Sequence, residues 1–126
     1  MNKILIVEDE RSIRQALKFE LEDEGYEVFD ASDYPEAVSA FNAFECDLII
    51  SDLFLNQGDG IQLLTQVKGG TRDIPFIGIT AYPDTHLAHQ AEKLLKDRLF
   101  IKPFMPTVIK DKINELLDKN TTAHAV

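Results

Sequence analysis

Short apolar runs alternate along this chain with longer stretches in which apolar residues recur every three or four positions. Continuous apolar runs are typical of strands buried on both faces of a parallel sheet, whereas the wider spacing is typical of amphipathic helices. The alternation therefore predicts βα units and an α/β fold. The predicted strands cover residues 3–7, 26–31, 47–51, 76–79 and 99–101.

Five helices are predicted between and after these strands. Glycine ends the first helix and a glycine pair ends the third, because glycine readily adopts the positive φ of a helix stop. Side-chain oxygens cap the second and the fourth. These stops and caps are Gly25, Ser32 or Asp33, Gly69 with Gly70, and Asp84 or Thr85. The fourth helix is expected to end near Asp97 and the last to cover about 106–117, while residues 56–60 are expected to form a loop.

The apolar positions of the helices identify the side chains that we expect to face the core. In the first helix they include Leu17, Phe19 and Leu21, and in the last helix they include Val108 and Ile109. These positions recur at near-helical spacing, which indicates one buried stripe on each helix. Both helices are therefore expected to pack against the sheet.

Strict alternation of five strands and five helices leaves few arrangements, because parallel crossovers are right-handed. The natural one for 126 residues is a flavodoxin-like doubly wound sheet with strand order 2-1-3-4-5. We expect one domain over residues 1–118 and a flexible tail over 119–126, which has nothing to pack against. Ligands of such sheets bind beyond the carboxyl ends of the strands, at the switch point between the first and third strands.

Composition narrows the class of protein. A content of 44% hydrophobic and 28% charged residues suits a globular domain, and a net charge of −9 disfavours binding to nucleic acid or to anionic membranes. No stretch approaches the roughly 20 apolar residues of a membrane span, and the N-terminal apolar block is too short for a signal peptide, so we expect a cytoplasmic protein. Cys46 is the only cysteine, which excludes an intrachain disulfide and favours a buried, inert thiol.

Polar residues at the ends of the predicted strands form one chemical set. Glu8 and Asp9 follow the first strand, Asp52 the third, Thr80 the fourth and Lys102 the fifth. Because parallel strands end at the same edge, three carboxylates, a hydroxyl and an ammonium should converge there. Clustered carboxylates repel one another, and a divalent cation with oxygen ligands removes that cost. The set predicts a Mg²⁺ site beside a phosphoryl pocket, with Asp52 as the nucleophile.

Four stretches match one known family, in order and at the strand ends. They are ILIVEDE at 4–10, SDL at 51–53 with Asp59-Gly60, ITA at 79–81 and KPF at 102–104. On these motifs the chain resembles a bacterial response-regulator receiver domain over residues 2–118. The resemblance implies a phosphoacceptor switch rather than an enzyme, with only Mg²⁺-dependent self-phosphorylation and autodephosphorylation.

The resemblance also implies partners and residue roles. Asp52 would accept phosphate from a phosphohistidine on a histidine kinase or a histidine phosphotransfer protein. A downstream protein would bind the face of the fourth helix, the fifth strand and the last helix. The implied roles are Mg²⁺ binding by Glu8, Asp9, Asp52 and the main-chain carbonyl of Phe54, phosphoryl contacts by Thr80, Ala81 and Lys102, and a cis peptide bond before Pro103. Mn²⁺ or Ca²⁺ could substitute for Mg²⁺.

The chain departs from the family at positions that tune the switch. Leu99 stands three residues before Lys102, where the family usually has Tyr or Phe, and the adjacent Phe100 is expected to point to the opposite face of its strand. Phe54 and Tyr82 occupy the two positions that usually set how fast the phosphoryl group is lost. Both are bulky, and neither is a good base for activating water. We therefore expect a long-lived phosphorylated form.

Other functions remain open on the sequence alone. A haloacid-dehalogenase-like phosphatase also uses Asp and Mg²⁺, but it needs a second Asp where Phe54 stands. A flavodoxin needs a phosphate-binding loop after the first strand, where the Glu-Asp-Glu of this chain would repel the FMN phosphate. The remaining alternative is a receiver-like docking module that is never phosphorylated, and the intact acidic and phosphoryl-binding set speaks against it.

Overall fold

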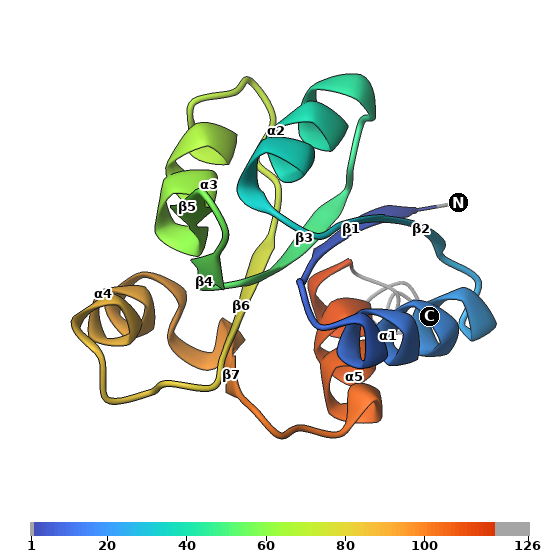
Figure 1. The fold of residues 1–126 in the computed structure, drawn as a ribbon. Helices are drawn as coiled ribbons and strands as arrows, with labels where there is room; N and C mark the ends of the chain where they lie inside the picture. The colour runs from blue at the N-terminus through green and yellow to red at the C-terminus, as the bar shows by residue number, and fades with distance from the viewer. Residues whose placement is uncertain (1, 118–126) are drawn as a thin grey trace.

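The computed structural model describes residues 2–117, in which five parallel strands form one sheet (Figure 1). The order of its strands is β2-β1-β3-β6-β7, which is the predicted order 2-1-3-4-5 counted along the chain. The predicted tail over 119–126 lies outside the described residues. The strands are β1 (Lys3–Val7), β2 (Glu27–Ala31), β3 (Leu48–Asp52), β6 (Phe76–Thr80) and β7 (Leu99–Ile101).

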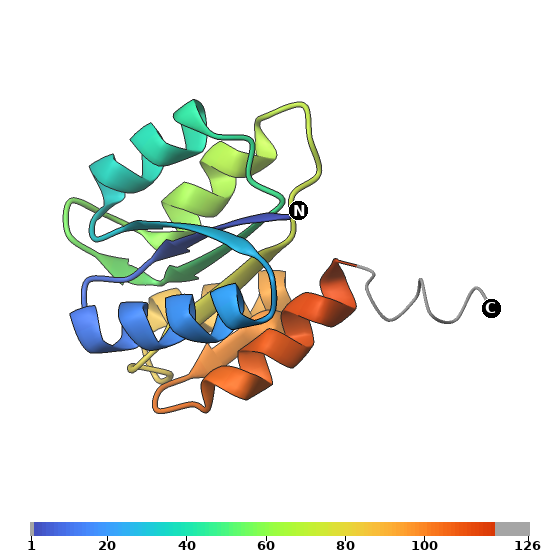
Figure 2. The ribbon, with the colours of Figure 1, turned by 90° about the vertical axis from the view of Figure 1, so that its right-hand side faces the viewer.

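Helices cover both faces of the sheet, so that the molecule has three layers (Figure 2). Three helices pack on one face and two on the other. Their buried residues accordingly form two separate apolar clusters, one on each face of the sheet. The first face carries α2 (Tyr34–Ala43), α3 (Gly60–Lys68) and α4 (His86–Leu95), and the second carries α1 (Arg11–Asp23) and α5 (Pro106–Leu116). The α/β prediction is confirmed.

The strands alternate between the two clusters, as the period of two in a strand requires. In β1, Leu5 and Val7 pack with the α2, α3 and α4 cluster, whereas Ile4 and Ile6 pack with α1 and α5. All residues of β3 and β6 are buried, which explains their continuous apolar runs. At the edge, Leu99 joins the first cluster and Phe100 the second, so the prediction that they point to opposite faces is confirmed.

The predicted helix caps are resolved by the structure. Asp33 rather than Ser32 caps α2, because its carboxylate accepts a hydrogen bond from the Glu36 N–H. Thr85 rather than Asp84 caps α4. Gly25 follows α1 with φ of 102°, a conformation that glycine adopts without strain.

Of the side chains predicted above to face the core, Val108 and Phe19 point outward instead. Val108 is 47% exposed and Phe19 is 73% exposed. Ile109 and Ile113 of α5 are fully buried, and Val108 lies about 100° away from Ile109 around the helix axis. Phe19 lies two residues from both Leu17 and Leu21, which places it on the opposite side of α1 from the core.

Two local elements also differ from the prediction. The loop over 56–60 is part of a small antiparallel hairpin formed by β4 (Phe54–Leu55) and β5 (Gly58–Asp59). A Cβ atom at Gly58 would lie 2.4 Å from the Tyr34 ring, so the absence of a side chain lets the hairpin pack against the start of α2. The fourth helix ends at Leu95 rather than near Asp97, and a 3₁₀ turn, η1 (Lys96–Arg98), continues the chain.

Polar contacts link the amino-terminal ends of the strands, which we call the amino edge of the sheet. This edge lies opposite the predicted site at the carboxyl ends of the strands. Asp47 accepts hydrogen bonds from the Lys3 N–H at 2.7 Å and from Arg72 at 3.0 Å. Arg72 also donates to the carbonyl of Cys46 at 3.0 Å. Cys46 is buried as predicted, and burial followed by the neighbouring charge of Asp47 raises the pKa of its thiol to about 11. Within residues 2–117, no helix is long and apolar enough to cross a membrane.

Candidate functional site

The predicted acidic residues meet at the carboxyl edge of the sheet. Glu8 follows β1 and Asp52 ends β3, and the two strands are paired in register up to Val7 and Ser51. Carboxylate oxygens of Glu8, Asp9 and Asp52 all lie within 4.8 Å of one another. Glu8 and Asp52 are buried, whereas Asp9 is exposed. This arrangement gives one acidic pocket that is open on the side of Asp9.

Lys102 enters the same pocket from the end of β7. Its Nζ lies 2.7 Å from Oδ2 of Asp52, 2.8 Å from Oε1 of Glu8 and 3.3 Å from Oε1 of Glu10. Burial alone would lower the pKa of Lys102, but hydrogen bonds and charge from Asp52 and Glu8 outweigh it and raise the pKa. Lys102 is therefore a fixed cation. The contact with Glu10 was not predicted, because Glu10 lies beyond the acids that directly follow β1.

Glu8 is the least satisfied acid of the pocket. Its Oε2 accepts a hydrogen bond from the Glu10 N–H at 3.0 Å. Its Oε1 forms an ion pair with the Lys102 ammonium at 2.8 Å, and no other donor among the described residues reaches it. Burial, with a smaller contribution from the charge of Asp52, raises the pKa of Glu8 to about 7. A buried carboxylate of this kind is stabilised by a further cation, a water molecule or a proton.

The donor set fits a hard divalent cation. All three groups of the cluster are carboxylates, and Mg²⁺ and Ca²⁺ prefer oxygen ligands. The three carboxylates lie within 4.8 Å of one another, and Lys102 balances only part of their charge, so the cluster has the negative charge that a metal ion requires. The acidic triad can therefore hold a metal.

Asp52 and Thr80 are each held by the backbone two residues later. Oδ1 of Asp52 accepts the Phe54 N–H at 3.0 Å, and Oγ1 of Thr80 accepts the Tyr82 N–H at 3.0 Å. Because a hydroxyl that accepts one hydrogen bond keeps its own proton, Thr80 can still donate to a group in the pocket. The next residue, Ala81, is exposed.

The two aromatic side chains singled out in the sequence contact each other. The rings of Phe54 and Tyr82 meet edge to face, with centroids 5.4 Å apart. The backbone N–H groups of these two residues donate to Asp52 and Thr80, so the aromatic pair is anchored next to both residues. Edge-to-face pairs are favoured by the ring quadrupoles.

Glycines and a cis bond shape the remaining walls. A Cβ at Gly60 would lie 2.9 Å from the carbonyl oxygen of Asp52, so a side chain there would push the end of β3 away. Leu99 packs on Gly78, where an added Cβ would lie 3.1 Å from its Cδ1. The peptide bond between Lys102 and Pro103 is cis.

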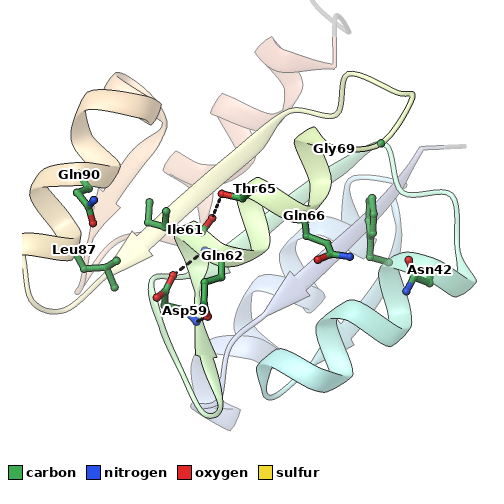
Figure 3. A pocket seen from close by; sticks show the side chains of 11 residues that line it. Asn42, Asp59, Ile61, Gln62, Thr65, Gln66, Gly69, Leu87 and Gln90 are labelled. Carbon is green, nitrogen blue, oxygen red and sulfur yellow. Dashed lines mark hydrogen bonds between the residues drawn. The ribbon is translucent and has the colours of Figure 1, made fainter.

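A separate hollow lies away from the acidic pocket. An open groove of about 700 Å³ runs along α3 between the end of α2 and the start of α4 (Figure 3). Amide and apolar side chains line it, and its one charged residue, Asp59, is engaged in the capping of α3 with Gln62. No set of charged groups converges in this groove, so the chemistry lies at the carboxyl edge of the sheet. The polar side chains that line the groove are Asn42, Gln62, Thr65, Gln66 and Gln90, together with Asp59.

Comparison with known proteins agrees with this geometry. Residues 4–114 match the response regulator receiver domain family. The chain belongs to this family. Receiver domains are signalling modules rather than enzymes, and they act with histidine kinases as partners.

Curated relatives are longer than this chain. The phosphate regulon transcriptional regulatory protein PhoB of Escherichia coli is 35% identical over 117 residues, which are 91% of this chain and 51% of PhoB. The alkaline phosphatase synthesis transcriptional regulatory protein PhoP of Bacillus subtilis is 32% identical over 121 residues, 96% of this chain and 50% of PhoP. The receiver domain thus spans about half the length of the curated relatives it matches.

Solved receiver structures share the fold. The response regulator TrrA of Thermotoga maritima, solved in complex with Mg²⁺ and BeF, is 32% identical with a TM-score of 0.79, covering 92% of this chain and 99% of TrrA. A CheY-like receiver domain protein of Methanospirillum hungatei is 27% identical with a TM-score of 0.83, covering 98% of both chains. Both likenesses extend over almost the whole described fold.

Proposed function

We propose that this receiver domain is a phosphoacceptor switch in which Asp52 takes a phosphoryl group from a phosphohistidine of a histidine kinase or a histidine phosphotransfer protein. The observation that carries the proposal is the position of Lys102, whose ammonium contacts Asp52 at 2.7 Å and Glu8 at 2.8 Å beside the acidic triad. A fixed cation next to a carboxylate nucleophile is suited to binding the anionic oxygens of a phosphoryl group.

The proposed metal is Mg²⁺, with Mn²⁺ or Ca²⁺ as substitutes. Asp9 and Asp52 would bind it directly, Glu8 would bind it or hold one of its waters, and the main-chain carbonyl of Phe54 would complete the protein ligands. When bound, Mg²⁺ would neutralise the clustered carboxylates and the oxygens of the incoming group. Support comes from the clustering of the three carboxylates and from the Mg²⁺–BeF complex of the related TrrA.

The transfer forms one bond and breaks another. A carboxylate oxygen of Asp52 attacks phosphorus, the P–N bond to the donor histidine breaks, and the imidazole leaves with the electron pair and takes up a proton. Lys102, the Thr80 hydroxyl and the Ala81 N–H are the proposed contacts to the phosphoryl oxygens. Since Asp52 is an ionised acceptor paired with Lys102, no base is needed to deprotonate it.

The output of the switch is proposed to be altered binding of a downstream protein on the face formed by α4, β7 and α5. Ile101, Met105 and Val108 are large apolar side chains exposed along β7 and α5, which supports a protein-binding surface. A basic patch on the partner would complement the net charge of −9. A cytoplasmic location remains a prediction that rests on the family.

Incubation with Mg²⁺ and acetyl phosphate, followed by intact-mass measurement, tests the proposed function. We expect one added phosphoryl group on the wild type and none on Asp52→Ala. Asp84→Ala is the matched control, because Asp84 is an exposed acid that follows β6 by several residues, and it should be modified like the wild type.

The other outcomes of this experiment test the need for Mg²⁺ and the role of Asp52. Omission of Mg²⁺ with added chelator should abolish the modification of the wild type. Modification of Asp52→Ala at the wild-type level would refute Asp52 as the acceptor. An unmodified wild type, also with a purified histidine phosphotransfer protein as donor, would favour the docking module that is never phosphorylated.

A further inference from the structure

Arg14, in the first turns of α1, contacts the acidic edge without belonging to the predicted site. Its Nη1 donates to the main-chain carbonyl of Glu8 at 2.8 Å, and its Nε lies 3.4 Å from Oδ2 of Asp30 in β2. The guanidinium is mostly covered, with a side chain 19% exposed. Arg14 therefore joins the end of β1 to the end of β2.

The carbonyl that Arg14 holds lies just beyond the sheet. Val7 and Ala31 are the last paired residues of β1 and β2, and the Glu8 N–H donates to the Ala31 carbonyl at 3.0 Å. The Glu8 carbonyl has passed the end of this register, and the guanidinium supplies a donor there. The peptide group that joins Glu8 to Asp9 is thus fixed by a charged hydrogen bond, which is stronger than a neutral one.

This peptide group lies between the two adjacent acids of the triad. A rotation of its plane would move the carboxylates of Glu8 and Asp9 relative to Asp52, whose own position is set by β3. Arginine is suited to preventing that rotation, because its planar fork holds two partners in a fixed geometry. A single contact would leave the guanidinium free to swing, whereas Asp30 holds its other side.

We propose that Arg14 is a positioning residue of the receiver site, which fixes the Glu8–Asp9 peptide through the Glu8 carbonyl and so presents both carboxylates to a divalent cation. The inference rests on the proposed function insofar as that cation is Mg²⁺. Arg14 itself touches neither the cation nor the phosphoryl group. Groups of this kind, one contact behind the ligands, typically change metal affinity by about 10-fold to 100-fold when they are removed.

The chain contains a matched control at the opposite edge of the sheet. Arg72 makes the same two kinds of contact, to the main-chain carbonyl of Cys46 and to the carboxylate of Asp47, both at 3.0 Å. It is remote from the acidic triad. Arg14→Met and Arg72→Met therefore remove equivalent contacts, one beside the site and one away from it.

Isothermal titration with Mg²⁺ compares the wild type with these variants. We expect Arg14→Met to weaken Mg²⁺ binding about tenfold and Arg72→Met to leave it unchanged. Arg14→Lys should recover part of the affinity, because an ammonium can donate to the Glu8 carbonyl without holding Asp30 in the same geometry. Equal affinities of Arg14→Met and the wild type, or equal losses in Arg14→Met and Arg72→Met, would overturn the proposal.

Amide hydrogen exchange gives a second readout that needs no metal. The Glu10 N–H donates to Oε2 of Glu8, so its exchange reports how firmly the acidic turn is held. Arg14→Met should accelerate this exchange in the metal-free protein, and Arg72→Met should not. An unchanged exchange rate in Arg14→Met would refute the positioning role. A wild type that binds no Mg²⁺ would refute the proposed metal, and the exchange experiment would still test the role of Arg14.

A milder variant covers the case in which Arg14→Met does not fold. Asp30→Asn removes the ion pair and leaves the hydrogen bond from Arg14 to Glu8 in place. It should weaken Mg²⁺ binding in the same direction as Arg14→Met but by a smaller factor. Wild-type affinity together with wild-type exchange of the Glu10 amide in Asp30→Asn would contradict the proposal.

Discussion

The two edges of the sheet use similar residues with opposite results. At the amino edge, Asp47 accepts from both the Lys3 N–H and Arg72, so that each carboxylate oxygen has a donor. At the carboxyl edge, the carboxylates of Glu8, Glu10 and Asp52 share the ammonium of Lys102, and Asp9 adds a further acid beside Glu8 and Asp52. The first edge is balanced, and the second carries an excess of negative charge.

This difference separates a contact that stabilises from a site that binds. A buried acid without its full complement of donors costs folding free energy, and the fold carries that cost only where strands converge at their carboxyl ends. Burial, with a smaller contribution from the charge of Asp52, raises the pKa of Glu8 to about 7, so the ionised form of this acid is held at a cost. A cation that enters this edge relieves a strain that the amino edge does not have.

Replacement of the central cation should have the largest effect. Lys102→Met leaves the buried carboxylates of Glu8 and Asp52 uncompensated, and we expect it to lower the free energy of unfolding by about 3 kcal/mol without Mg²⁺. Arg72→Met at the more exposed amino edge should cost less than about 1 kcal/mol. Urea denaturation with and without Mg²⁺ measures both. Equal losses of unfolding free energy in Lys102→Met and Arg72→Met would show that the two edges do not differ in charge balance.

The next effect is a pH dependence of metal binding. Below its raised pKa of about 7, Glu8 holds a proton that a cation must displace, so Mg²⁺ affinity should fall by up to about tenfold per pH unit as the pH drops below 7. Above this pKa, Glu8 is already ionised and the affinity should level off. Titration calorimetry across this range provides the measurement. Glu8→Gln should flatten the profile, Asp47→Asn should keep it, and a flat wild-type profile would contradict the prediction.

The smallest effect concerns shielding of the loaded site. Phe54→Asn opens the aromatic pair and introduces a polar group beside Asp52, so loss of the phosphoryl group should accelerate several-fold, a change of about 1 kcal/mol in barrier. Intact-mass measurement over time after removal of the donor follows the loss. Phe19→Asn is the control, because this exposed phenylalanine lies on α1 with its ring in solvent. An unchanged or slower loss in Phe54→Asn would show that the pair does not shield.

Much of the fold could be predicted because the sheet is buried on both sides. A strand such as β6 is apolar at every position before its final threonine, and that run is visible without knowledge of its neighbours. The polar residue that ends each run then marks the edge where ligands bind. For this reason the convergence of Glu8, Asp52 and Lys102 could be predicted from the order of the strands and their end residues in the sequence.

Contacts that depend on side-chain direction could not be predicted in this way. Arg14 and Asp30 are ordinary surface charges in the sequence, and only the turn of α1 beside β2 brings them together. The β4–β5 hairpin contains two residues per strand, too few for a period to be visible. The orientation of Val108 was available from spacing, since Ile109 and Ile113 already define the buried stripe of α5.

The covered thiol of Cys46 has a practical consequence for spectroscopy. With 1% of its surface exposed and its pKa raised to about 11, the only cysteine of the chain presents almost no thiolate to an alkylating reagent at neutral pH. A fluorophore or spin label can therefore be attached to a cysteine introduced on an outer helix surface while the native one is retained. Movement of the acidic edge during loading can then be recorded on an otherwise unaltered molecule.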